Sequence, residues 1–174
     1  RDDVRRSLVL VDGAGYDGQF MYFATFDPLL RAYRRTPATY RRFIDAPPYR
    51  FGRIGFSLLT RVVSVGHWAW VPGIMVWLIL GALSVVALLL ALLARQAGLP
   101  PAMGALVLVV PGFWQSVQTG LPEPIAAATL VAGVSCLANR RWVLTALFFA
   151  LSLLVRETGL IAIGCLLVGA AISG

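Results

Sequence analysis

Residues 71–94, VPGIMVWLILGALSVVALLLALLA, form a continuous apolar run with no ionisable side chain. An α-helix rises about 1.5 Å per residue, so a helix over this run is long enough to cross the roughly 30 Å hydrocarbon core of a bilayer. In water such a stretch would present no polar surface. The run therefore predicts a transmembrane helix, and it decides the fold class.

Charge is distributed unevenly along the chain. Charged residues make up 13% of the 174 residues, hydrophobic residues make up 59%, and the formal net charge is +7. Charge is least costly at the ends of membrane-crossing helices. We therefore expect an all-α, polytopic membrane protein whose chemistry lies where its charged first loop meets the helix ends. After residue 61 the charged residues are Arg95, Glu123, Arg140, Arg141, Arg156 and Glu157.

The chain divides into three expected regions. Residues 1–52 have no sustained period and predict an irregular or partly helical extramembrane loop. Residues 53–66, RIGFSLLTRVVSVG, predict an interfacial helix with Ile54, Leu58, Leu59 and Val62 on one apolar face. Residues 67–174 predict a transmembrane bundle. We expect about five membrane segments in it, at 71–94, 101–118 with a break at Pro111-Gly112, 124–138, 142–155 and 158–173.

Small residues in the last segments predict helix packing. Gly164, Gly169 and Ala170 are of the kind that allows two helices to approach closely. Cys136 and Cys165 lie in apolar runs, which favours buried packing over a disulfide or a metal site. We expect no metal, no cofactor and no nucleic-acid partner; the expected partners are membrane lipids.

The short connections predict an orientation. Arg95, and Arg140 with Arg141, lie in connections that fall on one side of the membrane, and the positive-inside rule makes that side cytoplasmic. The other side receives the loop 116–123, the Arg156-Glu157 turn and residues 1–52. We expect a protein integral to the bacterial inner membrane, with a non-cytoplasmic N-terminal loop. The chain begins at Arg1 and stops within an apolar run, which suggests a piece of a longer protein.

Four short motifs carry the chemical interest. They are Tyr16-Asp17-Gly18-Gln19-Phe20, Arg50-Phe51-Gly52-Arg53-Ile54, Pro122-Glu123-Pro124 and Arg156-Glu157-Thr158. In this order and spacing they resemble the YDGQF-like, R-x-x-R-I-like, TEP-like and RET motifs of bacterial polytopic glycosyltransferases of the GT-C type. The resemblance covers nearly the whole chain, and it implies that the family's first transmembrane helix and C-terminal part are missing. The chain departs from the pattern at Gly55-Phe56-Ser57, in place of an aromatic-proline pair, and at Pro122, in place of threonine.

The resemblance implies transfer of a sugar from a polyprenyl-phosphate carrier on the extracytoplasmic side. Asp17 matches the acidic residue that acts as general base on the acceptor hydroxyl, since a carboxylate within reach can take its proton. Arginines are expected to bind the lipid phosphate, because a guanidinium donates a fork of hydrogen bonds to phosphate oxygens. The expected substrate-binding residues are Tyr16, Gln19, Arg50, Arg53, Glu123, Arg156 and Glu157.

Three of the motifs also have ordinary structural interpretations. The Asp17-Gly18 pair is typical of a turn in which glycine supplies a positive φ. Arg50 and Arg53 could extend to lipid headgroups. Glu123 could stabilise the start of the following helix through the helix dipole.

The adjacent charges Arg156 and Glu157 predict a long-range contact. A charged pair beside lipid is costly unless each member has a partner. We expect one of them to pair with a residue of the N-terminal loop, namely Asp17, Arg50 or Arg53. The structural alternative is a turn whose two charges have separate partners.

Two other functions fit the composition. The first is a non-catalytic accessory subunit packed into a larger membrane complex of respiratory or photosynthetic type, which the short helices and interfacial aromatic residues would suit. The second is half of a transporter, which the sequence supports less well, because the long span carries no charge and no second repeat is visible.

Overall fold

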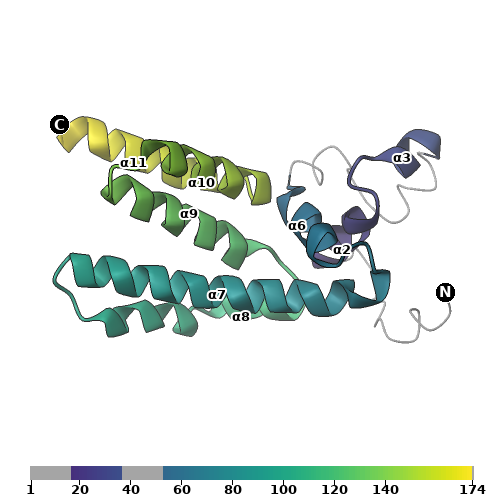
Figure 1. Ribbon diagram of the computed structural model, residues 1–174, viewed down its shortest axis with the longest axis horizontal. Helices are drawn as coiled ribbons and strands as arrows, with labels where there is room; N and C mark the ends of the chain where they lie inside the picture. Colours follow the sequence, from purple (N-terminus) through teal and green to yellow (C-terminus); the bar gives the residue numbers. More distant parts are fainter. Residues whose placement is uncertain (1–16, 37–52, 174) are drawn as a thin grey trace.

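A computed structural model describes residues 17–36 and 53–173 of the chain, and every regular element in these residues is helical (Figure 1). The all-α prediction is confirmed for this part of the chain. The elements are α2 (Asp17–Phe26), α3 (Arg31–Arg35), α6 (Gly55–Val63), the 3₁₀ helix η1 (Trp68–Trp70), α7 (Val71–Gln96), the 3₁₀ helix η2 (Pro101–Val109), α8 (Pro111–Thr119), α9 (Glu123–Ala138), α10 (Trp142–Val155) and α11 (Gly159–Ser173).

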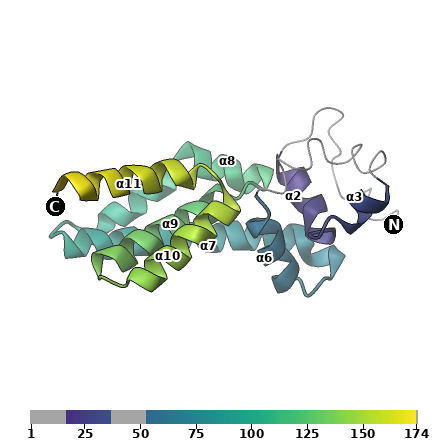
Figure 2. The same ribbon diagram turned by 90° about the horizontal axis from the view of Figure 1, so that it is seen from above.

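Helix α7 is the axis of the molecule. η2 and α8 return along one side of it, and α9 packs on another side and continues into the antiparallel helix α10 (Figures 1 and 2). Helices α2, α3 and α6 gather at the end where α7 begins. We call this the polar end of the bundle; it includes the end of α8 at Thr119, the start of α9 at Glu123 and the end of α10 at Val155.

Helix α7 is long and apolar enough to cross a membrane, as predicted from residues 71–94. The candidate span covers residues 68–96, and only 17% of its most apolar window is buried within the chain. A single stripe of α7, from Val71 through Ile79 to Val86, forms the contact with the other helices. Other apolar side chains are exposed, with Trp77 at 73%. Such a surface matches hydrocarbon better than water.

The predicted five membrane segments are only partly supported. In the described residues α7 alone passes the length and composition test, while α9 and α10 are apolar but have 16 and 14 residues. The segment 101–118 is broken as predicted: Val110 is extended before Pro111, because proline lacks an N–H and restricts the residue before it. The polar residues 116–119 belong to α8, so the predicted loop 116–123 shortens to the turn 120–122.

The predicted helix-packing surface at Gly164 and Gly169 stays a prediction within the described residues. A Cβ atom added at either glycine would meet no other atom within 4 Å. Two other glycines provide close contacts instead. A Cβ on Gly104 would lie 2.3 Å from the carbonyl oxygen of Ala87, and one on Gly133 would lie 2.4 Å from the ring of Phe149. In the described residues, helix α11 therefore has open space beside Gly164.

Helix α6 turns its polar face inward. Ser57, Thr60 and Ser64 are buried, and the Ser57 hydroxyl donates a hydrogen bond of 2.9 Å to the Met21 carbonyl of α2. Of the side chains predicted to form the apolar face, Leu58, Leu59 and Val62 are exposed and Ile54 is half-buried. This arrangement leaves an apolar surface pointing away from the protein, which is what an interfacial helix requires.

Candidate functional site

Two ion pairs lie at the polar end of the bundle and join motifs that are distant in sequence. In the first, Arg53 approaches Glu157 side-on: Nε donates hydrogen bonds of 2.9 Å to Oε1 and 2.7 Å to Oε2, and Nη2 also donates to Oε1. The Arg53 side chain is 7% exposed, whereas that of Glu157 is 51% exposed. The pair fixes the residues before α6 against the turn between α10 and α11.

The hydrogen bonds from Arg53 hold the pKa of the Glu157 carboxyl below its ordinary range, and partial burial opposes this effect. The carboxylate is therefore the favoured form at neutral pH. A buried guanidinium needs such a partner, because an uncompensated charge in a low-dielectric environment is costly.

The second ion pair joins Arg156 of the same turn to Glu123, the first residue of α9. Each side chain is about a quarter exposed. The Ser116 hydroxyl of α8 donates a hydrogen bond of 2.9 Å to the Gly112 carbonyl, and its oxygen lies 3.3 Å from the other carboxylate oxygen of Glu123. Glu123 also lies in the first turn of α9, where the helix dipole favours a negative charge. The carboxylate thus connects α8, α9 and the α10–α11 turn.

The first motif reaches the same place through its backbone. Asp17 begins α2, and a Cβ added to Gly18 would lie only 1.8 Å from the carbonyl oxygen of Thr119. Gly120, which ends α8 with φ of +70°, is also beside Gly18. Absence of a side chain at Gly18 therefore lets α2 touch the turn that leads to Glu123.

A second glycine has the same role on the other side. A Cβ on Gly55, at the start of α6, would lie 2.8 Å from the carbonyl oxygen of Leu154 near the end of α10. This close approach brings Arg53 within reach of Glu157. Gly55, where the chain departs from the GT-C motifs that it resembles, therefore makes a tight helix contact.

The structure brings together four of the predicted site residues, Arg53, Glu123, Arg156 and Glu157. The backbone of Asp17 lies beside this group through Gly18, and Gln19 is half-buried in α2. Tyr16 and Arg50 lie outside the described residues.

The predicted pairing of the Arg156-Glu157 turn with the N-terminal region is confirmed by the contact of Glu157 with Arg53. The two charges also have separate partners, as the structural alternative expected. The alternative interpretation of Gly18 is wrong, because this residue is helical and has no positive φ. The headgroup interpretation of Arg53 is wrong as well, since its side chain is buried against Glu157.

Sequence reasoning missed the contribution of Ser116, which is buried and contacts Glu123. Residues 116–119 are predicted as the start of the loop 116–123, because their side chains are mostly polar. A single serine in such a run carries no signal that it will face a carboxylate seven residues later. The described residues contain no group of three histidine, cysteine, aspartate or glutamate side chains that could hold a metal ion.

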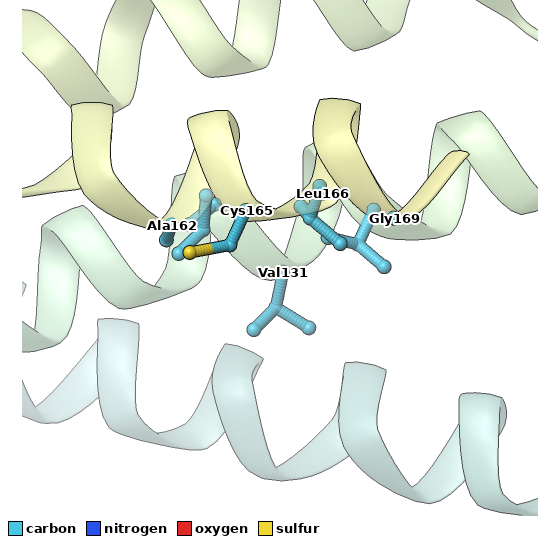
Figure 3. A pocket seen from close by; sticks show the side chains of 7 residues that line it. Val131, Ala162, Cys165, Leu166 and Gly169 are labelled. Carbon is cyan, nitrogen blue, oxygen red and sulfur yellow. The ribbon is translucent and has the colours of Figure 1, made fainter. Parts of the chain in front are cut away.

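An apolar groove lies between α9 and α11 (Figure 3). Its volume is about 620 Å³, and Val131 of α9 and Cys165 and Leu166 of α11 are among its lining residues. Leu130, Val134, Ala162 and Gly169 complete the lining. No charged side chain lines the groove in the described part of the chain, so it suits a hydrocarbon chain or an apolar side chain.

Comparison with known protein families, characterised proteins and solved structures finds no match to this chain. The resemblance to GT-C glycosyltransferases therefore rests on its four motifs and remains a prediction. What the geometry adds is that the described parts of these motifs meet at one end of the helical bundle.

We expect Glu157→Gln to destabilise the folded protein by about 1–2 kcal/mol, because it removes the Glu157 carboxylate charge from beside the buried Arg53, an effect that water reduces because Glu157 is half-exposed. The measurement is the melting temperature in nanodiscs at pH 7. A double-mutant cycle with Arg53→Gln isolates the pair. Additive effects would contradict the coupling.

The same pair predicts a pH dependence. The pKa of Glu157 is lower in the folded protein than in the unfolded chain. The contribution of Glu157 to stability is therefore fully present at pH values above its unfolded-state pKa, and it is lost as the pH falls through its folded-state pKa. The melting temperature of the wild type should therefore fall more steeply below about pH 5 than that of Glu157→Gln.

Proposed function

We propose that this protein is a membrane glycosyltransferase of the GT-C type, or part of one, that takes a sugar from a polyprenyl phosphate on the extracytoplasmic side. The observation that carries the proposal is the convergence of the four motifs. Arg53, Glu123 and the Arg156-Glu157 turn form two ion pairs, and Gly18 packs beside Glu123's turn, although these residues are scattered over most of the chain.

The proposed reaction breaks the bond between the sugar's anomeric carbon and the phosphate oxygen and forms a bond from that carbon to the acceptor oxygen. Asp17 takes the acceptor's proton as the new bond forms. The leaving polyprenyl phosphate gains negative charge, which guanidinium groups stabilise by charge-assisted hydrogen bonds. Arg156 is the favoured donor, because its side chain is more exposed than that of Arg53.

The apolar groove between α9 and α11 supports a lipid-linked donor. A polyprenyl chain needs a continuous hydrocarbon surface, and this groove offers one whose lining is apolar and open (Figure 3). The exposed apolar surface of α7 and the outward apolar face of α6 support a location in the membrane. On this proposal η2 with α8, α9, α10 and α11 accompany α7 in the bilayer as shorter or tilted segments.

The proposed topology predicts opposite labelling at the two ends of the bundle. Gln118 at the polar end and Asn139 between α9 and α10 are both exposed, whereas Ser116 is buried and unsuitable as a probe. We expect an impermeant maleimide applied from outside spheroplasts to label Gln118→Cys and to spare Asn139→Cys, in a background with Cys136 and Cys165 replaced by alanine. Labelling of both cysteines from one side would refute the topology.

The function is tested directly by transfer. The full-length protein is reconstituted in liposomes with radiolabelled sugars on polyprenyl phosphate and a membrane extract as acceptor source. Release of polyprenyl phosphate coupled to a labelled product is the expected result. An absence of transfer from every donor, with the protein folded, would overturn the enzymatic proposal.

A second candidate function is a non-catalytic subunit of a larger membrane complex. The observation that favours it is the surface of α11, where a Cβ added to Gly164 would meet nothing within 4 Å and Ile161 is 71% exposed. Small residues allow another helix to approach closely. On this proposal Gly164→Leu should release the protein from its complex. On the glycosyltransferase proposal the same substitution should leave sugar transfer in liposomes unchanged.

A further inference from the structure

A second cavity lies where η2 meets α8, and it differs in chemistry from the apolar groove. Its volume is about 790 Å³, which is within the range of small-molecule sites. One wall is apolar and comes from η2 and the helix junction. The other wall is the face of α8 that carries Trp114, Gln115 and Gln118 together with Thr119. Leu108, Val109 and Pro111 supply the apolar side.

The polar wall of this cavity offers neutral hydrogen-bonding groups beside an aromatic ring. Gln115 lies three residues before Gln118 and four before Thr119, so these side chains share one face of α8. Each amide can donate and accept hydrogen bonds. Gln115 and Gln118 are both exposed, which is costly if this face met lipid chains. The face must therefore meet water or a polar ligand.

The indole of Trp114 is held in place. Its Nε1 donates a hydrogen bond of 2.6 Å to the Leu108 carbonyl across the helix junction, and the side chain is 47% exposed. The polar tip of the ring is thus satisfied by the protein, while part of the ring remains available for contact. A fixed aromatic surface beside amide groups is suited to a ligand with both an apolar face and hydroxyl groups.

All seven lining residues are uncharged, so this cavity has no counter-charge for a phosphate. The arginines that could bind phosphate pair with Glu123 and Glu157 instead. The cavity nevertheless adjoins the start of α2, because the carbonyl oxygen of Thr119 touches Gly18, the neighbour of Asp17. The Thr119 end of the cavity is therefore close to the backbone at the start of α2.

We propose that this cavity binds a neutral carbohydrate, the sugar portion of the acceptor. This inference rests on the proposed function, since the acceptor is the substrate whose hydroxyl must reach Asp17. A pyranose has an apolar face for the indole of Trp114 and hydroxyl groups for Gln115 and Gln118. On this proposal the neutral acceptor and the anionic donor bind on opposite sides of the Gly120 turn.

The test is binding of the full-length protein, in nanodiscs free of glycoside detergents, to an array of neutral oligosaccharides. The array carries gluco-, galacto-, manno-, rhamno-, arabino- and N-acetylhexosamine glycans, with inorganic phosphate as a competitor. We expect binding to at least one class, insensitivity to phosphate, and at least about tenfold weaker binding in Trp114→Leu and in Gln118→Leu. The matched controls are Trp142→Leu and Gln96→Leu, which change exposed residues elsewhere on the bundle.

The outcomes separate the site from the function. Absence of binding to every neutral glycan, or unchanged binding in both cavity variants, would overturn the carbohydrate site. If Asp17→Asn abolishes transfer while the cavity variants transfer normally, the glycosyltransferase proposal stands and the site falls. If glycan binding depends on Trp114 but the wild type transfers no sugar, the site stands and the enzymatic proposal falls.

Discussion

Replacing Asp17 with asparagine should lower sugar transfer by roughly 10² to 10⁴-fold, the usual contribution of a positioned general base. The change is nearly isosteric and lies at the first residue of α2, so the helix should form as before. The substrate affinity should change little, because asparagine can still accept a hydrogen bond from the acceptor hydroxyl but cannot take its proton. The measurement is the initial rate of transfer with saturating donor.

Asp27→Asn is the matched control for this variant. The carboxylate of Asp27 follows α2 and accepts a hydrogen bond of 2.7 Å from the backbone N–H of Arg31, a capping role that asparagine also performs. Transfer should be unchanged in the control. In Asp17→Asn the acid limb of the pH–rate profile, which reports the base, should disappear from the residual activity. If Asp17→Asn transferred sugar within about twofold of the wild-type rate, the loss would be far smaller than a general base contributes, and Asp17 would not be the base.

A single methyl group at Gly18 is expected to have the largest effect on the fold of the site. In Gly18→Ala the new Cβ would lie 1.8 Å from the carbonyl oxygen of Thr119 and 2.9 Å from its carbonyl carbon, and both are backbone atoms. A backbone contact cannot be relieved by a rotamer change, so α2 must move away from α8. Overpacking of this kind costs about 1–3 kcal/mol or more.

The displacement of α2 should also affect activity. Asp17 is the neighbour of Gly18, and a misplacement of about 1 Å can reduce a rate by roughly 10²-fold. We therefore expect both a lower melting temperature and slower transfer in Gly18→Ala. Gly81→Ala in α7 is the control, since a Cβ there meets nothing within 4 Å and alanine favours the helix. Equal stability of Gly18→Ala and wild type would contradict a close contact between α2 and the end of α8.

The two ion pairs impose a further constraint at the polar end of the bundle. Arg53 precedes α6 and Glu123 begins α9, and each forms an ion pair with a residue of the α10–α11 turn. A phosphate that binds Arg156 must compete with the Glu123 carboxylate for the same donor. Donor binding is therefore expected to rearrange the polar end of the bundle, in a direction that loosens the contact between α9 and this turn.

The sequence by itself determined where most helices begin and end. Residues 142–155 were predicted as a helix and form α10 with the same bounds, because an apolar run is bounded by Arg141 and Arg156. The break at Pro111 was also predictable, since proline imposes an extended residue before it. The polar end of α8 was missed because its serine, glutamine and threonine side chains resemble a loop in composition.

Only the tertiary structure decided which charges pair and which glycines are needed. Arg53 and Glu157 are 104 residues apart, and no local rule says that this arginine will meet Glu157 while Arg156 meets Glu123. Gly164 and Gly104 are equally small, yet only Gly104 packs against a neighbouring backbone. Helix formation depends on neighbours in sequence, whereas ion pairing and close approach depend on the register of helices that the chain brings together from afar.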